Sequence, residues 1–453
     1  MAGEIAVLID VGSTFTKVSA VDLKKCELIA SASSPTTAES DINLGIKNAL
    51  KSLETKTGTL KSYKLFACSS AAGGLKMAAS GLVPELTAYA AKQASLGAGA
   101  KLTRLFSYEL TRSDLSELSK LKPDIFLLCG GTDGGNRDCI IHNAEMLSKS
   151  DLSCPIIFAG NRSALDDCSE ILADKSFISC KNVMPSFGVL DISDVKQKIR
   201  ELFISRIIQA KGLSALQERL DYDLIPTPSA VLSAMSLYAK NKGDMLAIDL
   251  GGATTDVYSM ADGLPENDNT VIKGLREPYE KRTVEGDLGM RYSAGAVVEA
   301  LGLESFSAEY GFSADEINNN LSKINKHPET LEIPKDFDQA IVSSALSLAI
   351  RRHAGTIKQE YTPAGKIFVQ EGKDLRKTRR LILTGGALIN NLPKNISEKI
   401  SRRENELSLI PESLEIYLDK KYILSAVGLL AEKYPDCAIS IMEKEISLNG
   451  TCE

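Results

Sequence analysis

Histidine is scarce in this sequence, which contains only His142, His327 and His353, and none of the three has a neighbour at the spacing of metal ligands. The nine cysteines are scattered and include no CxxC pair. The sequence therefore offers few residues from which a histidine-based zinc site or a catalytic triad could be built. An odd, dispersed set of cysteines without a signal peptide is typical of reduced, buried thiols, so we expect a cytoplasmic protein.

Long apolar runs and clusters of positive charge are also missing. No apolar stretch reaches the roughly 18 residues that a membrane-spanning helix needs. The net charge is −6 and the sequence pI is near 5.5, without a basic stripe suited to a nucleic-acid backbone. With 453 residues, 43% of them hydrophobic, the chain can bury a large core and form two or more domains. We expect a soluble globular protein that binds neither membrane nor nucleic acid.

Three familiar glycine motifs are absent as well. The sequence has no GxxxxGK[ST], no GxGxxG and no GxSxG. A P-loop, a dinucleotide-binding fingerprint and the nucleophile turn of an α/β-hydrolase are therefore not supported.

Short apolar runs alternate with helical patterns, which indicates an α/β protein. Three strand-then-turn units between about residues 100 and 190 predict a small parallel, Rossmann-like insert. Residues 265–285 read as a loop, and residues 435–453 as a poorly tied tail. We predict strands at 4–11, 16–23, 63–70, 124–131, 155–160, 175–180, 245–251, 255–260 and 380–386, and helices at 42–54, 84–98, 161–173, 194–209, 229–241, 293–301, 337–359 and 421–434.

One stretch of sequence occurs twice. LIDVGSTFTKVSAVD (8–22) and AIDLGGATTDVYSMAD (247–262) share a frame of apolar residues, aspartate, glycine and threonine, about 239 positions apart. Such self-similarity predicts two duplicated lobes, each opening with a hairpin. We expect lobe I at 1–235, lobe II at 236–420, and a helix at 421–453 that returns to lobe I and ends in the tail.

The two hairpin turns carry the residue types that bind phosphate. A glycine turn presents backbone N–H groups without a side-chain clash, and neighbouring hydroxyls add donors. Asp10 and Asp249, at the strand ends, can hold the waters of a hydrated Mg²⁺. A third strand, LILTGGALIN (381–390), ends in two glycines that suit a nucleoside floor. The candidate ligand residues are Gly12, Ser13, Thr14, Lys17, Gly251, Gly252, Thr254, Gly385 and Gly386.

The order of DVGSTFTK, DLGGATTD and LTGGAL resembles the phosphate-1, phosphate-2 and adenosine motifs of the actin, sugar-kinase and heat-shock-chaperone ATPase superfamily. The resemblance implies two ribonuclease-H-like lobes around Mg·ATP, with Asp10 and Asp249 as the catalytic, metal-associated aspartates. Chaperones of this superfamily carry a water-ordering glutamate where this chain has Thr227. Threonine is a poor proton acceptor, so whether ATP is hydrolysed slowly or only sensed stays open.

A narrower resemblance rests on CSSAAGGLKMAASGL (68–82), LLCGGTDGGNRD (127–138) and VEGDLGMRYSAGAVVEALG (284–302). These stretches resemble the glutamate mutase L family, often written MutL. The resemblance implies an ATP-driven accessory factor that releases damaged cobalamin from an adenosylcobalamin-dependent mutase, either glutamate mutase or an aminomutase. Thr132 and Asp133 are candidates for contact with a cofactor, a mutase or ATP, or belong to a packed turn. Arg291 is a candidate nucleotide contact.

Two other functions of the same fold stay open at the level of sequence. The phosphate turns also resemble those of ATP-dependent hydantoinases and oxoprolinases, and a small-molecule kinase is a further alternative. A kinase needs a carboxylate base near the acceptor hydroxyl, and none can be singled out. A filament-forming actin relative needs a long self-complementary surface, which the sequence does not reveal.

Overall fold

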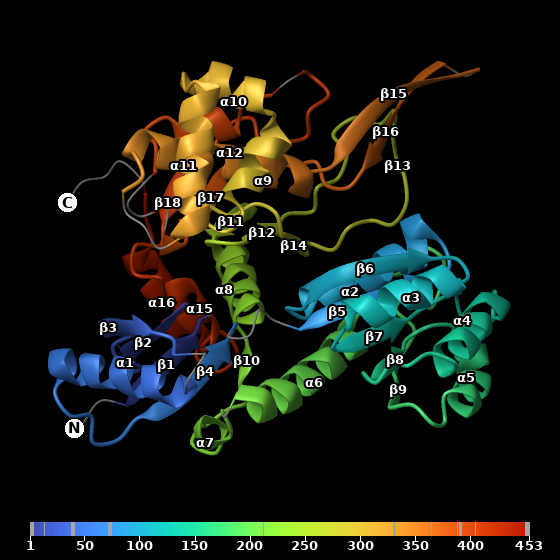
Figure 1. Cartoon of the computed structure of the whole chain (residues 1–453), viewed down its shortest axis with the longest axis horizontal. Coiled ribbons are helices and arrows are strands. Elements are labelled where there is room, and N and C mark those ends of the chain that lie inside the picture. The colour runs from blue at the N-terminus through green and yellow to red at the C-terminus, as the bar shows by residue number, and fades with distance from the viewer. Residues whose placement is uncertain are drawn as a thin grey trace. The chain divides into compact units, whose positions relative to one another are not determined.

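The computed structural model describes residues 4–12, 14–37, 41–70, 75–211, 213–328, 332–363, 365–386, 388, 392–403 and 405–448 (Figure 1). The chain forms two compact units that are not continuous in sequence. Unit 1 comprises Met1–Ser233, Lys273–Arg276 and Ser425–Cys437, and unit 2 comprises Ala234–Ile272, Glu277–Leu424 and Ala438–Glu453.

The first sheet of unit 1 is built around the hairpin of β1 and β2. Its five strands lie in the order β10-β4-β1-β2-β3. β2 pairs antiparallel with β1 and β3, whereas β4 is parallel to both β1 and β10. Helix α1 (Ile42–Thr57) packs against β2 and β3 and buries Ile46, Ala49 and Leu53 in the core of the unit. The strands are β1 Ile5–Val11, β2 Phe15–Asp22, β3 Glu27–Pro35, β4 Lys64–Ser69 and β10 Ile225–Pro226.

The second sheet of unit 1 is entirely parallel, in the order β6-β5-β7-β8-β9, and confirms the predicted Rossmann-like insert. It begins earlier than predicted, because β5 consists of small residues that do not stand out as a strand. The strands are β5 Lys76–Gly81, β6 Lys101–Ser107, β7 Ile125–Leu128, β8 Ile156–Phe158 and β9 Phe177–Ser179. Between them stand η1 Pro84–Ala88, α2 Tyr89–Gly97, α3 Arg112–Leu121, α4 Asp138–Ser148, η2 Arg162–Ala164 and α5 Leu165–Ile171.

The sheet of unit 2 repeats the first sheet of unit 1. Its order is β14-β12-β11-β17-β18-β19, with β11, β17 and β18 parallel and β12 antiparallel to both of its neighbours. The series β3-β2-β1-β4-β10 therefore corresponds to β14-β12-β11-β17-β18. Two ribonuclease-H-like sheets in one chain, with a Rossmann-like sheet in the first unit, form the actin-like ATPase fold. The strands are β11 Met245–Leu250, β12 Thr255–Met260, β14 Glu280–Glu285, β17 Arg380–Thr384, β18 Glu415–Leu418 and β19 Ser447–Leu448.

Helices cover the unit 2 sheet, and a small extra sheet extends from it (Figure 1). The extra sheet has the order β13-β16-β15. Its strands are β13 Thr270–Ile272, β15 Thr356–Thr362 and β16 Gly365–Glu371. The helices are α9 Ala294–Leu301, α10 Leu303–Tyr310, α11 Ala314–Lys326, α12 Lys335–His353, α14 Ile396–Ile400 and α16 Pro435–Glu445. In unit 1, α6 Ser193–Lys211 and α7 Ser214–Gln217 precede α8 Thr227–Lys242. Three helices cross a unit boundary, namely α8, α15 Ile423–Gly428 and α16.

Four sequence-based expectations are wrong. The helix predicted over 337–359 ends at His353, because β15 starts at Thr356. The predicted loop 265–285 contains β13 and β14. The helix predicted over 421–434 is only α15, followed by turns. The predicted tail contains α16, whose Cys437, Ala438, Ile441 and Met442 are buried.

Among the helices of the described ranges, none combines the length and the apolar character that crossing a lipid bilayer requires.

Candidate functional site

Asp10 lies at the end of β1, where it is buried and accepts hydrogen bonds from three side chains. Thr227 Oγ1 donates to Oδ1 at 2.7 Å, and Cys68 Sγ donates to the same oxygen at 3.5 Å. Ser425 Oγ donates to Oδ2 at 2.9 Å. Three neutral donors thus fix both carboxylate oxygens.

Each donor comes from a different element of unit 1. Cys68 stands beside Asp10 because β4 pairs with β1 in parallel register. Thr227 is the first residue of α8, and Ser425 lies in α15. Burial, and then the charge of Asp10, raise the pKa of the Cys68 thiol well above its usual range. The thiol therefore keeps its proton and acts as a donor.

The first candidate phosphate turn connects β1 and β2. Gly12 N donates to Phe15 O at 3.1 Å, and a Cβ at Gly12 would lie 2.6 Å from that oxygen. Only glycine fits there. Thr14 is exposed, and Lys17 stands opposite Asp10 in the β1·β2 register. Ser13 lies outside the described residues.

The second turn, between β11 and β12, has the same geometry. Gly251 N donates to Thr254 O at 2.9 Å. Asp249 occupies the position of Asp10, is half-buried, and stands beside Thr384 of β17 in parallel register. On the other side it faces Asp256 rather than a lysine, and Arg282 Nε of β14 donates to Asp256 Oδ1 at 2.8 Å.

All four carbonyl groups of the second turn are engaged. Thr254 O accepts from Gly251 N, and the other three accept from Leu288–Ser293, which we call the turn-supporting segment. Its Gly289 has no room for a side chain, because a Cβ would lie 2.6 Å from Ala253 Cα. The donors are Met290 N to Gly251 O at 3.2 Å, Arg291 N to Gly252 O at 2.9 Å and Ser293 Oγ to Ala253 O at 2.6 Å.

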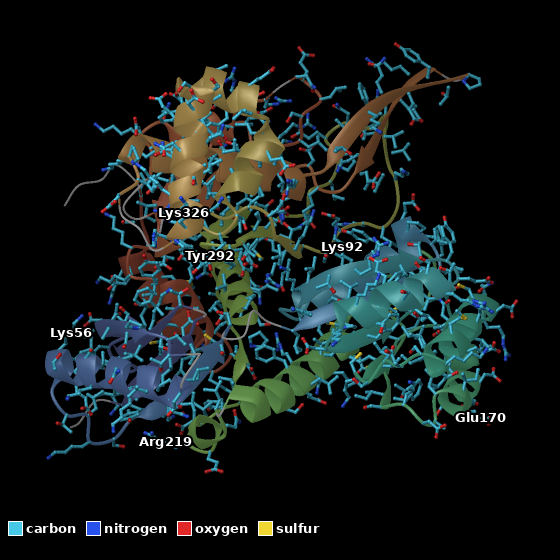
Figure 2. All side chains as sticks on the ribbon, in the orientation of Figure 1. Lys56, Lys92, Glu170, Arg219, Tyr292 and Lys326 are labelled. Atoms are coloured by element: carbon cyan, nitrogen blue, oxygen red, sulfur yellow. The ribbon has the colours of Figure 1, made fainter. Side chains whose placement is uncertain are left out.

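The N–H groups of the second turn are available to a ligand. Among the described residues, none accepts a hydrogen bond from the N–H of Gly252, Ala253 or Thr254. A short turn that presents N–H groups while its carbonyls are occupied fits a phosphate. Tyr292, labelled in Figure 2, is 72% exposed beside Gly252. No group of three or more His, Cys, Asp or Glu side chains in the described ranges is arranged to hold a metal.

The third motif lies next to the second turn within unit 2. Gly385 follows β17 with φ +117°, and a Cβ there would collide with the carbonyl oxygen of Leu250 at the end of β11. Gly386 is exposed, and its backbone faces the hydroxyl of Tyr422. Asp249, the second turn and the two glycines therefore gather at one end of the β11–β17 pair.

Sequence reasoning missed the residues that hold the start of α15. Asp419 is fully buried and accepts from Ile423 N at 2.8 Å, from Leu424 N at 3.1 Å and from Thr384 Oγ1 at 3.1 Å. An aspartate shortly before a helix is a capping signal that the sequence does contain. Burial, followed by the charges of Asp419 and Asp249, raises the pKa of Tyr422.

Two further candidates have structural partners. The Arg291 guanidinium forms a two-pronged ion pair with Asp338, at 2.9 and 2.8 Å. Asp133 Oδ1 accepts from Arg162 N and from Asn182 Nδ2, both at 2.9 Å. The turn after β7 has positive φ at Gly130, Gly131 and Gly134, as expected for a packed turn. The side chains of Arg291 and Asp133 are therefore both engaged within the protein, which argues against either of them as a ligand contact.

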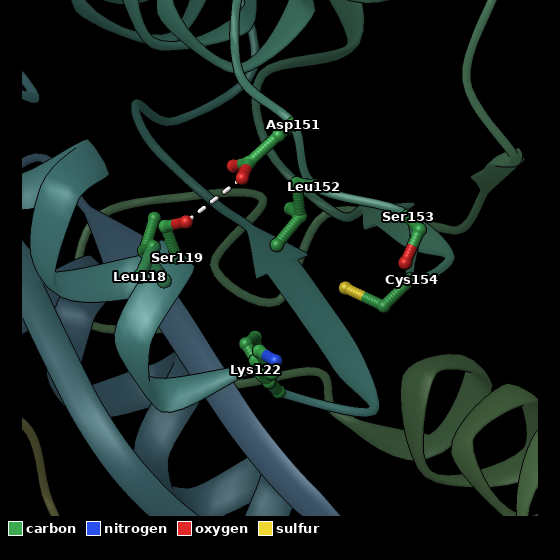
Figure 3. Close-up of a pocket in the computed structure, with 8 residues that line it drawn as sticks. Leu118, Ser119, Lys122, Asp151, Leu152, Ser153 and Cys154 are labelled. Carbon is green, nitrogen blue, oxygen red and sulfur yellow. Dashed lines mark hydrogen bonds between the residues drawn. The ribbon is translucent and has the colours of Figure 1, made fainter.

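One cavity of about 280 Å³ lies in the Rossmann-like part of unit 1 (Figure 3). Ser119 Oγ donates to Asp151 Oδ2 at 2.8 Å on its wall. Lys122 precedes β7 and Cys154 precedes β8, so the cavity opens at the amino ends of these strands. Ligands of open α/β sheets bind at the carboxyl ends, which makes this cavity a poor candidate.

Comparison with known proteins identifies relatives. The MutL protein family model matches residues 6–446. Protein MutL of Clostridium tetanomorphum is 44% identical over 457 residues, covering 97% of this chain and 98% of that protein. Nucleotide-free acetone carboxylase aligns with 95% of this chain and 70% of its own, at 14% identity and TM-score 0.43. The ADPNP-bound activator of 2-hydroxyisocaproyl-CoA dehydratase from Clostridium difficile aligns over 100% of both chains, at 12% identity and TM-score 0.31. Because the family match spans nearly the whole sequence, this chain belongs to the MutL protein family.

Proposed function

We propose that this protein binds Mg·ATP and reactivates an adenosylcobalamin-dependent mutase, such as glutamate mutase or an aminomutase, in the cytoplasm. The observation that carries the nucleotide part is the second turn, with three N–H groups open to a ligand and every carbonyl engaged. Membership of the MutL family supports the mutase as partner.

In this proposal the two turns bind the phosphates, and Asp10 and Asp249 hold waters of the Mg²⁺. The metal supplies charge neutralisation at the phosphates when it is bound. Gly385 and Gly386 form the nucleoside floor, because they lie beside the second turn and leave room on the exposed side. The phosphate-binding residues are Gly12, Ser13, Thr14 and Lys17 in the first turn and Gly251, Gly252 and Thr254 in the second.

ATP turnover in this proposal is slow. Thr227 occupies the position of the chaperone glutamate, and its hydroxyl already donates to Asp10 at 2.7 Å. A threonine hydroxyl is too weak a base to deprotonate an attacking water. The protein then uses nucleotide binding, with occasional hydrolysis, to drive release of inactive cobalamin.

The test combines binding and reactivation. Glutamate mutase that has been inactivated by turnover is incubated with the protein, Mg·ATP and fresh adenosylcobalamin, while Mg·ATP affinity is measured by calorimetry. We expect wild type to restore turnover only with ATP. The double variant Asp10→Asn/Asp249→Asn should lose at least tenfold in affinity and all reactivation.

The matched control is Asp174→Asn/Asp315→Asn, which changes one exposed aspartate in each unit and should behave as wild type. Circular dichroism verifies that both double variants are folded. No Mg·ATP binding by wild type would overturn the nucleotide role. Binding without reactivation of either glutamate mutase or an aminomutase would overturn the mutase role.

A further inference from the structure

A second cavity, of about 400 Å³, lies in unit 1, and no residue of the turns discussed above lines it. Its walls come from α6, β4, α8, β10 with the chain before it, and α15 with the turns that follow it. Phe66 and Tyr222 form an aromatic wall, with ring centroids 5.0 Å apart and planes inclined by 17°. This volume is within the range of small-molecule sites, roughly 300 to 1,000 Å³.

Arg200 of α6 lines this cavity and lacks an acceptor. Its Nε is buried, and no hydrogen-bond partner for it exists among the residues that the structure describes. Burial lowers the pKa of the Arg200 guanidinium, and the negative charge of Glu432 offsets this only in part, which reflects the cost of keeping the charge away from water. A buried donor without an acceptor destabilises the folded protein, and more so when it is charged. An anionic group in the cavity would remove that cost.

The same cavity also carries carboxylates. Asp223, Glu201 and Glu432 line it together with Lys433. Lys433 lies over the Tyr222 ring, 5.5 Å from its centroid, and within 3.3 Å of Glu432. Glu201 is also paired with Lys198 at 2.6 Å, and Asp223 Oδ1 accepts from Gln217 Nε2 at 3.3 Å. Asp223 has no cationic partner among these contacts, so a purely anionic ligand would be repelled most strongly there. A ligand that carries one negative and one positive group could pair with Arg200 through the first and with the carboxylates through the second.

We propose that this cavity binds a free α-amino acid. The ligand carboxylate pairs with Arg200, the ammonium group faces the carboxylates, and the side chain packs against the aromatic wall. The cavity shares β4, α8 and α15 with the donors of Asp10, so a bound amino acid would contact the elements that fix this carboxylate. The proposal does not depend on nucleotide binding.

The test is calorimetric titration of the full chain, without nucleotide, with each of the twenty common L-amino acids. We expect saturable, one-to-one binding of at least one of them. Arg200→Met keeps the apolar stem but removes the charge, and it should weaken this binding at least tenfold. Arg112→Met, at an exposed arginine of the same unit, should leave it unchanged.

Ligand chemistry gives an independent check should Arg200→Met fail to fold. The N-acetyl derivative of the bound amino acid lacks the ammonium group, and the carboxamide derivative lacks the carboxylate. Both should bind at least tenfold more weakly than the parent. The proposal is overturned if no amino acid binds wild type, if folded Arg200→Met binds as wild type does, or if both derivatives retain full affinity.

Discussion

At the scale of single residues, Asp10 has an unusual set of hydrogen-bond donors. Its three donors are separated from it by 58, 217 and 415 positions in the sequence. Hydrogen bonds to a charged group contribute about 1.5 to 3 kcal/mol each, so these residues join distant parts of unit 1. Asp10 therefore serves stability as well as any role in ligand binding.

We predict that Thr227→Val destabilises the protein. Valine has nearly the shape of threonine but cannot donate to Asp10, so the free energy of unfolding should fall by about 1.5 to 3 kcal/mol. Thr227→Ser retains the hydroxyl and should lose less than half as much. Chemical denaturation measures both, with Thr55→Val on the exposed face of α1 as control. Equal losses for the valine and serine variants would show that the hydroxyl is irrelevant.

A second residue with a clear physical signature is Lys373 in unit 2, whose side chain is fully buried. Its Nζ donates to the carbonyls of Ala261 and Tyr279, both at 2.7 Å, and to Ser259 Oγ at 3.3 Å. Burial lowers the pKa of Lys373 from 10.5 to about 7, against the opposing charge of Glu277. Near neutral pH this amine is partly uncharged in the folded state.

This pKa predicts how stability changes with pH. Between about pH 7 and pH 10.5 the unfolded chain keeps a proton that folded Lys373 has lost, so stability rises with pH, by at most about 1.4 kcal/mol per unit. Below pH 7 both states are protonated and the slope vanishes. Denaturation of wild type and Lys373→Met between pH 6 and 10 tests this. The slope should disappear in Lys373→Met and persist in Lys377→Met, whose side chain is 82% exposed; identical slopes in all three would refute the assignment.

At the scale of elements, the turn-supporting segment holds the second turn in shape. Leu288–Ser293 engages three carbonyls of that turn, and Gly289 contacts the backbone of Ala253. The rigidity of the N–H groups thus depends on a neighbouring segment and not only on the hairpin. The turn-supporting segment lies within residues 284–302, one of the stretches that resemble the MutL family. Holding the second turn in shape is therefore a structural role for part of that stretch.

We predict that Gly289→Ala reduces Mg·ATP affinity at least tenfold in a protein that still folds. A methyl group 2.6 Å from Ala253 Cα must push the turn aside and misdirect its N–H groups. Gly295→Ala is the matched control, because a Cβ there meets nothing within 4 Å. Within α9 it should add up to about 1 kcal/mol of stability. Calorimetric titration measures both, and wild-type affinity in folded Gly289→Ala would contradict the predicted role of the segment.

The hairpins and the Rossmann-like strands could be predicted from sequence because their signals are local. Apolar alternation that ends in aspartate and glycine marks β1–β2 and β11–β12 without any knowledge of partners. Strand β5 was not predicted because its residues are small and give no clear apolar pattern. The start of β15 was predicted as helix because only two residues separate it from α12. The donors of Asp10 could not be predicted, since their proximity is created by tertiary folding.

At the scale of the whole molecule, the chain passes from one unit to the other at five points, and three of these lie inside helices. The helical crossings are in α8 between Ser233 and Ala234, in α15 between Leu424 and Ser425, and in α16 between Cys437 and Ala438. The other two flank the short segment Lys273–Arg276. Each of the three helices continues through its crossing, and no glycine- or proline-rich linker marks the crossing. A search for linkers in the sequence therefore finds no boundary, whereas the repeated hairpin reveals the duplication directly.

The thiol of Cys68 makes Asp10 visible to spectroscopy. The S–H stretching vibration absorbs in a region of the infrared spectrum that is nearly empty of other protein bands, and its frequency falls when the thiol donates a hydrogen bond. Cys26 and Cys168, by contrast, donate to the backbone carbonyls of Leu23 and Ile140. Cys68 is therefore a built-in vibrational probe, already in place and needing no label, that reports whenever the charge or position of the Asp10 carboxylate changes.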